Sequence, residues 1–286
     1  MAMKNMLSPS TKNKIDTIEL TIPVKKVEEE LFPDVKEEKK FSIIIPAYNE
    51  ENRIGQTIED LEARVPFISE IIVIFDGNDH TPEVAMGSGK KVKVLRYDNR
   101  LGHGGAVFEG IKHAKEDIVC FIDADGSAPA FEVYRICSLV NNNTPAVFGS
   151  RWAVGSKIGQ RESLRNIIGG RVYRYMAFVI LGVKVKDSFC GLKAFKKEVA
   201  LELTKRVTLS DRTFNIAIAY NLKLMGYEPS EIGIEWSHKQ GTQLPVGIKV
   251  IAIMFLTLLG LRVAHSSKIK RFKFMIIGIR KKIRFY

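Results

Sequence analysis

Residues 118–127 read Ile-Val-Cys-Phe-Ile-Asp-Ala-Asp-Gly-Ser, an apolar run that ends in two carboxylates, Asp123 and Asp125. The run predicts a buried strand that delivers both side chains to its C-terminal end, the edge where open α/β sheets bind ligands. Carboxylates this close repel each other unless a cation lies beside them. Mg²⁺ typically takes one or two protein carboxylates together with phosphate oxygens. The pattern also fits a solvated loop whose aspartates cap a helix.

Strand and helix patterns alternate before this run. Apolar runs predict four strands, at 41–45, 70–75, 91–96 and 117–122, and Pro46 stops the first of them. Helical spacing of apolar residues marks 50–64, and a glycine-rich turn opens a helix over 104–114. Elements that alternate in this way form βαβ units, so we expect an α/β fold with a mainly parallel sheet flanked by helices.

The amino-acid composition limits the class of protein to which the chain can belong. The chain has 286 residues, of which 45% are hydrophobic and 27% charged, as is ordinary for a globular protein. Its three cysteines give no even disulfide framework, and no Cys/His cluster suggests zinc. A reducing, cytosolic setting is the simplest expectation, and the first 40 residues show no pattern of a secretory leader.

The chain divides by composition into three parts. Residues 1–40 form a charged N-terminal extension with one edge strand expected at 15–22, and residues 41–245 form the main domain. Residues 246–286 hold ten Lys and Arg and no Asp or Glu, so they carry +10 of the chain's net charge of +12.

The basic tail predicts contact with a membrane surface. Its apolar run 250–261 would be about 18 Å long as a helix, too short to cross a hydrocarbon core of roughly 30 Å. The segment 269–283 mixes apolar with basic residues, as do amphipathic helices that lie on anionic headgroups. A core helix followed by a solvated basic end is the alternative. We expect no nucleic acid partner, because no recognised motif accompanies the charge.

Several motifs along the chain resemble those of family 2 glycosyltransferases, which have the Rossmann-like GT-A fold. They are Phe41-Ser-Ile-Ile-Ile-Pro-Ala-Tyr-Asn-Glu-Glu51, Asp76-Gly-Asn-Asp-His-Thr81, Leu101-Gly-His-Gly-Gly-Ala106, Asp123-Ala-Asp-Gly-Ser127 and Gly149-Ser-Arg151. Asp187-Ser-Phe-Cys-Gly-Leu-Lys-Ala-Phe195 and the segment from Glu235 are similar to dolichyl-phosphate glucose and mannose synthases. The resemblance covers about residues 41–245.

The resemblance implies a nucleotide-sugar donor at the carboxyl edge of the sheet and Mg²⁺ or Mn²⁺ as cofactor. It assigns the cation to Asp123, Asp125 and Ser127. The residues that it assigns to the donor are Pro46, Ala47, Tyr48, Glu50, Asp76, Gly102, Gly104, Asp123, Ala124 and Asp125. Asp76 also fits simple turn chemistry, because Asp-Gly favours turns, and the glycines also fit a tight strand-to-helix connection. His103 replaces the family's usual lysine, and we expect it to face solvent.

Basic residues after the Gly-Ser-Arg motif predict the acceptor site. Arginine forks suit bidentate phosphate contacts, and 159–166 resembles the segment that grips the lipid phosphate in dolichyl-phosphate mannose synthases. We expect Arg151, Arg161 and Arg165 to bind this phosphate, with Arg151 joining Asp123 and Asp125 as catalytic. Arg171 and Arg174 fit a solvated helix face better. The apolar run 172–183 fits either a core helix or a membrane-facing one.

Two departures from the family pattern bear on the reaction. Phe214-Asn215-Ile216-Ala217 stands where many relatives have Phe-Asp-x-Glu, so both carboxylates are missing. A phosphate acceptor already carries an oxyanion near neutral pH and can react without a strong base, which favours a lipid phosphate over a sugar hydroxyl. Asp211 could replace the base, although a helix N-cap explains it better. Phe75 replaces another aspartate, which leaves the nucleobase of the donor open.

These patterns predict an inverting hexosyltransferase that moves glucose or mannose from UDP-glucose or GDP-mannose to a polyprenyl (dolichyl-type) phosphate. We expect a peripheral or monotopic protein at the cytosolic face of a membrane, in contact with anionic lipid headgroups. Two other functions stay open: a family 2 transferase that acts on a glycan, and a non-enzymatic subunit that binds nucleotide sugars. The first predicts transfer without lipid phosphate, and the second predicts nucleotide binding without turnover.

Overall fold

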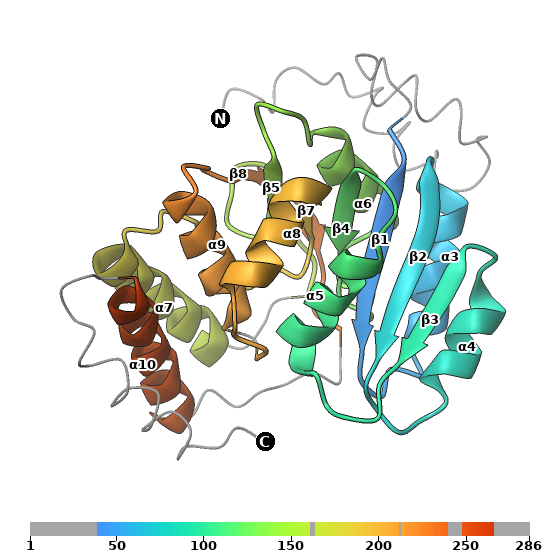
Figure 1. Ribbon diagram of the computed structural model, residues 1–286, viewed down its shortest axis with the longest axis horizontal. Helices are drawn as coiled ribbons and strands as arrows, with labels where there is room; N and C mark the ends of the chain where they lie inside the picture. Colours follow the sequence, from blue (N-terminus) through green and yellow to red (C-terminus); the bar gives the residue numbers. More distant parts are fainter. Residues whose placement is uncertain (1–38, 161–163, 212, 240–247, 266–286) are drawn as a thin grey trace. The chain divides into compact units, whose positions relative to one another are not determined.

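The computed structural model describes residues 39–160, 164–211, 213–239 and 248–265 (Figure 1). The described residues from Lys40 onward belong to one compact unit. The strand expected at 15–22 and the amphipathic segment 269–283 lie outside the described residues.

A seven-stranded sheet forms the centre of the described chain, in the order β3-β2-β1-β4-β7-β5-β8. Its strands are β1 (Phe41–Ala47), β2 (Ile68–Phe75), β3 (Val92–Arg96), β4 (Ile118–Phe121), β5 (Ala146–Ser150), β7 (Lys193–Lys196) and β8 (Ser230–Gly233). Of these, β7 runs antiparallel to both its neighbours, and the other pairings are parallel. A small second sheet pairs β6 (Lys157–Ile158) with β9 (Glu235–Trp236).

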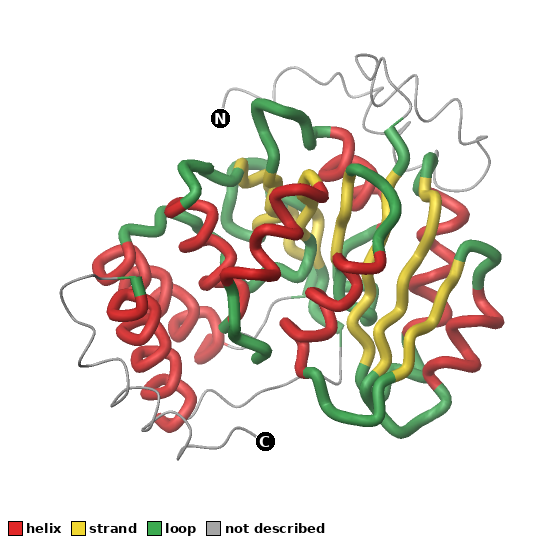
Figure 2. Tube along the Cα trace, viewed as in Figure 1, coloured by secondary structure: helices red, strands yellow, loops and turns green. Residues whose placement is uncertain are grey.

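Helices cover both faces of the sheet (Figure 1, Figure 2). One layer holds α3 (Ile54–Arg64), α4 (Thr81–Ser88) and α6 (Ala130–Ser138), and the other holds α5 (Gly102–His113), α8 (Lys197–Arg206) and α9 (Phe214–Leu224). Beyond α9, α7 (Leu164–Leu181) and α10 (Ile248–Ala264) lie side by side. The expected α/β fold with a mainly parallel sheet is therefore confirmed.

The central strands read as apolar runs because helices bury them on both sides. Ile43, Ile44 and Ile45 of β1 have no exposed surface, and neither do the four residues 71–74 of β2. On one face α5 approaches β1 so closely that a Cβ at Gly110 would lie 2.3 Å from Cγ2 of Ile44. A glycine at this position therefore allows the helix to reach the sheet.

The first strand continues past the proline that we expected to stop it. Ile44 accepts a hydrogen bond from Ile122 on the β4 side, and Ala47 accepts one from Asp76 on the β2 side. Since backbone groups of a strand alternate in direction, the nitrogen of Pro46 points toward β4, beyond the last residue of β4 that pairs with β1. No ladder hydrogen bond is lost there, which is the setting where a strand tolerates proline.

The apolar run 250–261 belongs to α10, and one side of that helix is covered by protein. Ile253 and Leu258 are buried, and Leu258 joins the core cluster that includes Tyr173 and Ala177 of α7. Within the described residues, no helix is long and apolar enough to cross a membrane.

Candidate active site

Both carboxylates of the Asp-x-Asp motif lie directly after β4, at the carboxyl edge of the sheet. Asp125 accepts hydrogen bonds at Oδ1 from the backbone nitrogen (3.0 Å) and the hydroxyl (2.6 Å) of Ser127. Thr57 of α3 holds the turn between them by donating to the carbonyl of Ala124 at 2.9 Å. The structure thus brings Asp125 and Ser127 together, and it leaves the side chain of Asp123 42% exposed.

His103 lies near this motif rather than facing solvent as we expected. Its Nε2 is 3.7 Å from Oδ1 of Asp123, and its ring centroid is 5.3 Å from that of Phe214. The position follows from how α5 begins, because Gly104 donates a backbone hydrogen bond to the carbonyl of Ser210. The start of α5 is therefore packed against the segment that precedes α9.

The loop after β1 is tied to the loop after β2. Oδ1 of Asn49 accepts from the nitrogen of Asn78 at 2.9 Å, and the nitrogen of Glu50 donates to the hydroxyl of Thr81 at 2.8 Å. These bonds fix Tyr48 and Glu50 at the same edge as Asp123. Pro46, Ala47 and Ala124, also expected at the donor, are buried, so their contact with the donor stays a prediction.

Glu50 is electrostatically linked to the Asp-x-Asp motif. Burial raises the pKa of Glu50 above its usual value, and the charges of Asp125 and Asp123 raise it as well. The guanidinium of Arg53, whose Nη2 lies 2.5 Å from Oε2 of Glu50, lowers that pKa and offsets part of the rise. A third carboxyl group therefore stands within electrostatic reach of the pair.

Asp76 holds the start of α5 with both of its oxygens. Oδ2 accepts from the backbone nitrogens of Leu101 (2.8 Å) and Gly102 (3.0 Å), and Oδ1 pairs with Arg100. The guanidinium carbon of Arg100 lies 3.3 Å from the centroid of the Tyr48 ring. A planar cation thus stacks on Tyr48 and donates to Asp76, two of the residues expected to hold the donor.

The glycines at the start of α5 are required by packing within the chain. Gly102 has a φ of +74°, and a Cβ there would lie 2.7 Å from the carbonyl oxygen of Ser210. A Cβ on Gly104 would lie 2.7 Å from Phe214. These glycines therefore form the tight strand-to-helix connection that was the alternative to donor binding. Donor binding by these glycines stays a prediction.

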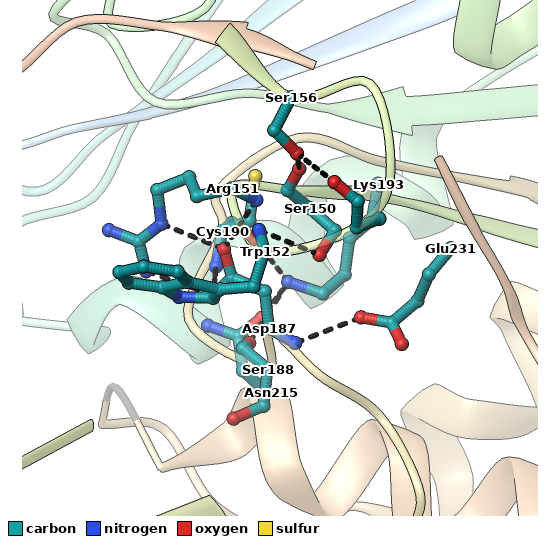
Figure 3. Close-up of polar contacts among 11 residues, drawn as sticks. Ser150, Arg151, Trp152, Ser156, Asp187, Ser188, Cys190, Lys193, Asn215 and Glu231 are labelled. Carbon is teal, nitrogen blue, oxygen red and sulfur yellow. Dashed lines mark hydrogen bonds and ion pairs between the residues drawn. The ribbon is translucent and has the colours of Figure 1, made fainter. Parts of the chain in front are cut away.

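Arg151 forms a bidentate ion pair with Asp187 (Figure 3). Its Nε lies 2.7 Å from Oδ2 and its Nη2 lies 2.9 Å from Oδ1, and its backbone nitrogen donates to Oδ2 at 2.9 Å. Burial alone would raise the pKa of Asp187, but the hydrogen bonds and charge of Arg151 outweigh it and bring that pKa below its usual value. One edge of the arginine fork is thus engaged by protein, and binding of the acceptor phosphate by Arg151 stays a prediction.

Lys193 is a fully buried lysine beside this pair (Figure 3). Its Nζ donates to Oδ1 of Asn215 at 2.8 Å and to the carbonyls of Ser188 and Cys190. Burial lowers the pKa of Lys193. Asn215 stands where many relatives have the aspartate of Phe-Asp-x-Glu, so in this chain an amide replaces a carboxylate at this lysine.

The loop held by these contacts presses against the Asp-x-Asp motif. A Cβ on Gly191 would lie 2.0 Å from Oδ2 of Asp123. A small pocket beside Asp123 is lined by Ser127, Cys190, Gly191 and Trp236, among others. Residues 187–192 thus form one wall of the site. The motif Asp187–Phe195 marked this segment in the sequence, but no spacing rule showed that Asp187 would meet Arg151 or that Lys193 would be buried.

The remaining arginines of the expected acceptor site are only partly described. Arg161 lies outside the described residues, and Arg165 lies on α7 with its side chain outside the description. Arg171 and Arg174 are exposed on α7, and the guanidinium carbon of Arg171 lies 5.5 Å from the ring centroid of Trp152. The N-cap of α9 is Thr213 rather than Asp211 as we expected. Oδ1 of Asp211 accepts a hydrogen bond from the backbone nitrogen of Thr213, so Asp211 holds the turn directly before the helix.

Comparison with known proteins places these features in a family. The model of glycosyl transferase family 2 matches residues 42–204. A dolichyl-phosphate beta-glucosyltransferase of Dictyostelium discoideum is 28% identical over 251 residues, which cover 78% of this chain and 76% of that protein. An uncharacterised protein of Methanocaldococcus jannaschii is 31% identical over 224 residues, covering 73% of this chain and 88% of that protein.

A solved structure shares the fold. Glucosyl-3-phosphoglycerate synthase from Mycobacterium tuberculosis, in complex with Mg²⁺ and UDP, superposes with a TM-score of 0.59 at 17% identity, over 85% of this chain and 83% of that one. With the family match, this likeness confirms the GT-A fold that the motifs indicated.

Proposed function

Because the chain belongs to glycosyl transferase family 2, we propose that it transfers glucose from UDP-glucose to a dolichyl-type polyprenyl phosphate. The observation that carries the proposal is its similarity, over most of its length, to a dolichyl-phosphate beta-glucosyltransferase. UDP is favoured as the nucleotide because a fold relative was solved with UDP. Mannose from GDP-mannose is the competing donor.

The acid pair has the oxygen ligands that a divalent cation prefers. No cluster of three or more His, Cys, Asp or Glu capable of holding a metal occurs within the described residues. Two carboxylates, completed by phosphate oxygens of the donor and by water, are nevertheless the usual surroundings of Mg²⁺. Asp123 and Asp125 would hold Mg²⁺ or Mn²⁺ here, with Ser127 orienting Asp125. The cation would stabilise the negative charge that gathers on the leaving diphosphate.

The reaction is a single displacement at the anomeric carbon of glucose. A phosphate oxygen of the lipid forms the new bond to this carbon while the bond to the diphosphate of UDP breaks, and the electron pair leaves with UDP. The configuration inverts. Tyr48, Glu50 and the start of α5 would hold the donor at the carboxyl edge of the sheet, opposite the wall formed by residues 187–192.

The surroundings of Asn215 suit a phosphate acceptor. A sugar hydroxyl must lose a proton as it attacks, which a general base accelerates. The side chain at position 215 is an amide that accepts a hydrogen bond from Lys193, so it cannot serve as that base. A phosphate monoester is largely deprotonated near neutral pH. The glycan acceptor is therefore the weaker alternative.

A lipid acceptor requires the site to open toward a bilayer. We place the protein at the cytosolic face of a membrane as a peripheral or monotopic protein. The support is the charge of residues 246–286, which carry ten basic residues and no acidic one. Anionic headgroups attract such a segment by about 1 kcal/mol per basic residue near the surface.

The experiment that tests this function crosses donors with acceptors. The full chain with Mg²⁺ or Mn²⁺ is incubated with radiolabelled UDP-glucose or GDP-mannose, and with dolichyl phosphate or dolichol in detergent. We expect label in the organic phase with UDP-glucose and dolichyl phosphate together. Label with GDP-mannose instead would show that GDP-mannose is the donor. Nucleotide binding without transfer would favour a binding subunit.

A further inference from the structure

The outward side of α7 is apolar. Large hydrophobic side chains exposed by between 49% and 75% recur at helical spacing along it: Leu164, Ile168, Val172, Tyr175, Phe178 and Val179. Among the fifteen large hydrophobic residues exposed in the described chain, eight lie between Trp152 and Val179. Clustering of this kind marks an interaction site, whereas single exposed residues need no explanation.

The inward side of the same helix is already packed. Tyr173, Ala177 and Leu181 are buried in the core, and α10 lies against α7. An ordinary surface helix pairs a buried apolar stripe with a polar outer face. Because α7 is apolar on both sides, its outer face has no role in holding the described fold together.

The charged residues of α7 itself all have one sign, because Leu164–Leu181 holds arginines and no Asp or Glu. Arg171 and Arg174 are exposed on α7, and Arg171 also stands over the ring of Trp152, which is itself exposed. From residue 151 to residue 186 the sequence holds eight Lys and Arg and a single acidic residue, Glu162. Apolar and aromatic side chains next to arginines are the composition of helices that lie in a membrane interface.

We propose that the outer face of α7, together with Trp152, is the surface by which this protein docks on an anionic lipid bilayer. The helix would lie in the plane of the membrane with its apolar side chains below the headgroups and its arginines among the phosphates. The inference rests on the proposed function in one respect, since a lipid acceptor reaches the site from the same bilayer. The outer face of α7 would be a second membrane contact, besides the basic tail of residues 246–286.

Two other occupants fit the charges less well. In a two-fold dimer the same patch meets itself, which would bring Arg171 and Arg174 of each copy toward those of the other. Residues 266–286 carry eight basic residues and no acidic one, so they have the same sign as α7. A bilayer with anionic lipids is complementary to the arginines as well as to the apolar residues.

The test measures binding of the full chain to vesicles, without donor or acceptor. Vesicles of phosphatidylcholine with phosphatidylserine are compared with phosphatidylcholine alone, by flotation. Ile168→Glu, Tyr175→Glu and Val179→Glu place a carboxylate on the outer face. Met86→Glu on α4 and Leu224→Glu on α9 are matched controls, because these residues are also exposed. Each α7 variant should bind about tenfold more weakly, and both controls should bind like the wild type.

Trp152 gives a second readout on the same preparation. The chain has two tryptophans, and Trp236 is 9% exposed. Brominated lipids should quench the fluorescence of the wild type and leave that of Trp152→Phe nearly unchanged. Transfer in detergent, which needs no vesicle, should persist in all variants, so a failure of the proposed activity stays separate from a failure of docking.

Three results would overturn the proposal. Vesicle binding that survives all three α7 substitutions would place the membrane contact elsewhere in the chain. Binding that is independent of anionic lipid would remove the role of the arginines. A concentration-dependent dimer in sedimentation that Ile168→Glu dissociates would make a second copy the occupant.

Discussion

Removing the carboxylate of Asp187 should destabilise the protein more than any surface ion pair does. Asp187 is 2% exposed and accepts hydrogen bonds from three nitrogens of Arg151 and from the nitrogen of Cys190. Breaking a buried pair by removing one partner leaves the other charge uncompensated and costs about 3–5 kcal/mol. Since whole domains are stable by roughly 5–15 kcal/mol, Asp187→Ala should lower the free energy of unfolding by a large fraction.

Urea unfolding followed by circular dichroism measures this effect. Glu83→Ala is the matched control, because Glu83 pairs with Arg96 on the surface, at 2.6 Å with both side chains half exposed, and such pairs contribute about 0–1 kcal/mol. In Asp187→Ala with Arg151→Met the loss should be smaller than the sum of the single losses, since no buried charge is left unpaired. If Asp187→Ala does not fold, Asp187→Asn gives the comparison with a similar shape.

The same pair predicts a dependence on pH. Because the pKa of Asp187 is lower in the folded state, its stabilisation is fully present above the unfolded value of about 3.9. It is lost as pH falls below that value through the folded pKa. The wild type should therefore lose stability in acid more steeply than Asp187→Ala. A loss of unfolding free energy in Asp187→Ala no larger than in Glu83→Ala would contradict the role of this buried pair.

Three further substitutions probe the site. Asn215→Asp places a carboxylate against the buried Lys193, so it should raise the free energy of unfolding near neutral pH by about 1–3 kcal/mol. A lower free energy of unfolding in urea would mean that Lys193 is not held as a cation. Arg100→Ala removes the guanidinium that covers Tyr48 and pairs with Asp76, contacts that together contribute about 1 kcal/mol. Because UDP would no longer have to displace these contacts, calorimetry should show UDP binding about fivefold tighter. Weaker binding would mean that Arg100 itself contacts the nucleotide. Gly191→Ala would place a Cβ 2.0 Å from Asp123, so kcat should fall by about tenfold or more. Gly87→Ala, which has open space around it, should leave kcat unchanged. Equal kcat values of the two variants would mean that residues 187–192 do not position Asp123 for catalysis.

The sequence predicted the sheet best where burial is complete. Strands β1, β2 and β4 are continuous apolar runs because both of their faces are covered, and the motifs that end them gave the edge where the site lies. Pro46 looked like a stop because the pattern cannot show which neighbouring strand has already ended. Strand β7 begins with Lys193, and the sequence pattern gave no reason to expect a charged side chain without exposed surface inside the sheet.

The side-chain partners in the site were harder to foresee. Asp187 follows Arg151 by 36 residues, and their contact depends on how the segments after β5 and before β7 pack, with β6 and α7 lying between them in the sequence. His103 looked solvent-facing because the packing of α5 against the segment before α9 has no local signal. Of the two interpretations of the run 172–183, the core helix is confirmed for the inner face of α7, which is buried. The outer face is apolar and exposed, and its contact with a membrane stays a prediction.

The central claim is that the Asp-x-Asp motif supports glucosyl transfer to a lipid phosphate. The most direct measurement compares Asp125→Asn with Asp117→Asn, because Asp117 is exposed next to the opposite end of β4. Transfer from UDP-glucose to dolichyl phosphate is measured over a range of Mg²⁺ concentrations. We expect wild-type transfer in Asp117→Asn, and in Asp125→Asn a loss of at least about a hundredfold. Full transfer by Asp125→Asn, at the Mg²⁺ concentration that the wild type requires, would contradict the central claim.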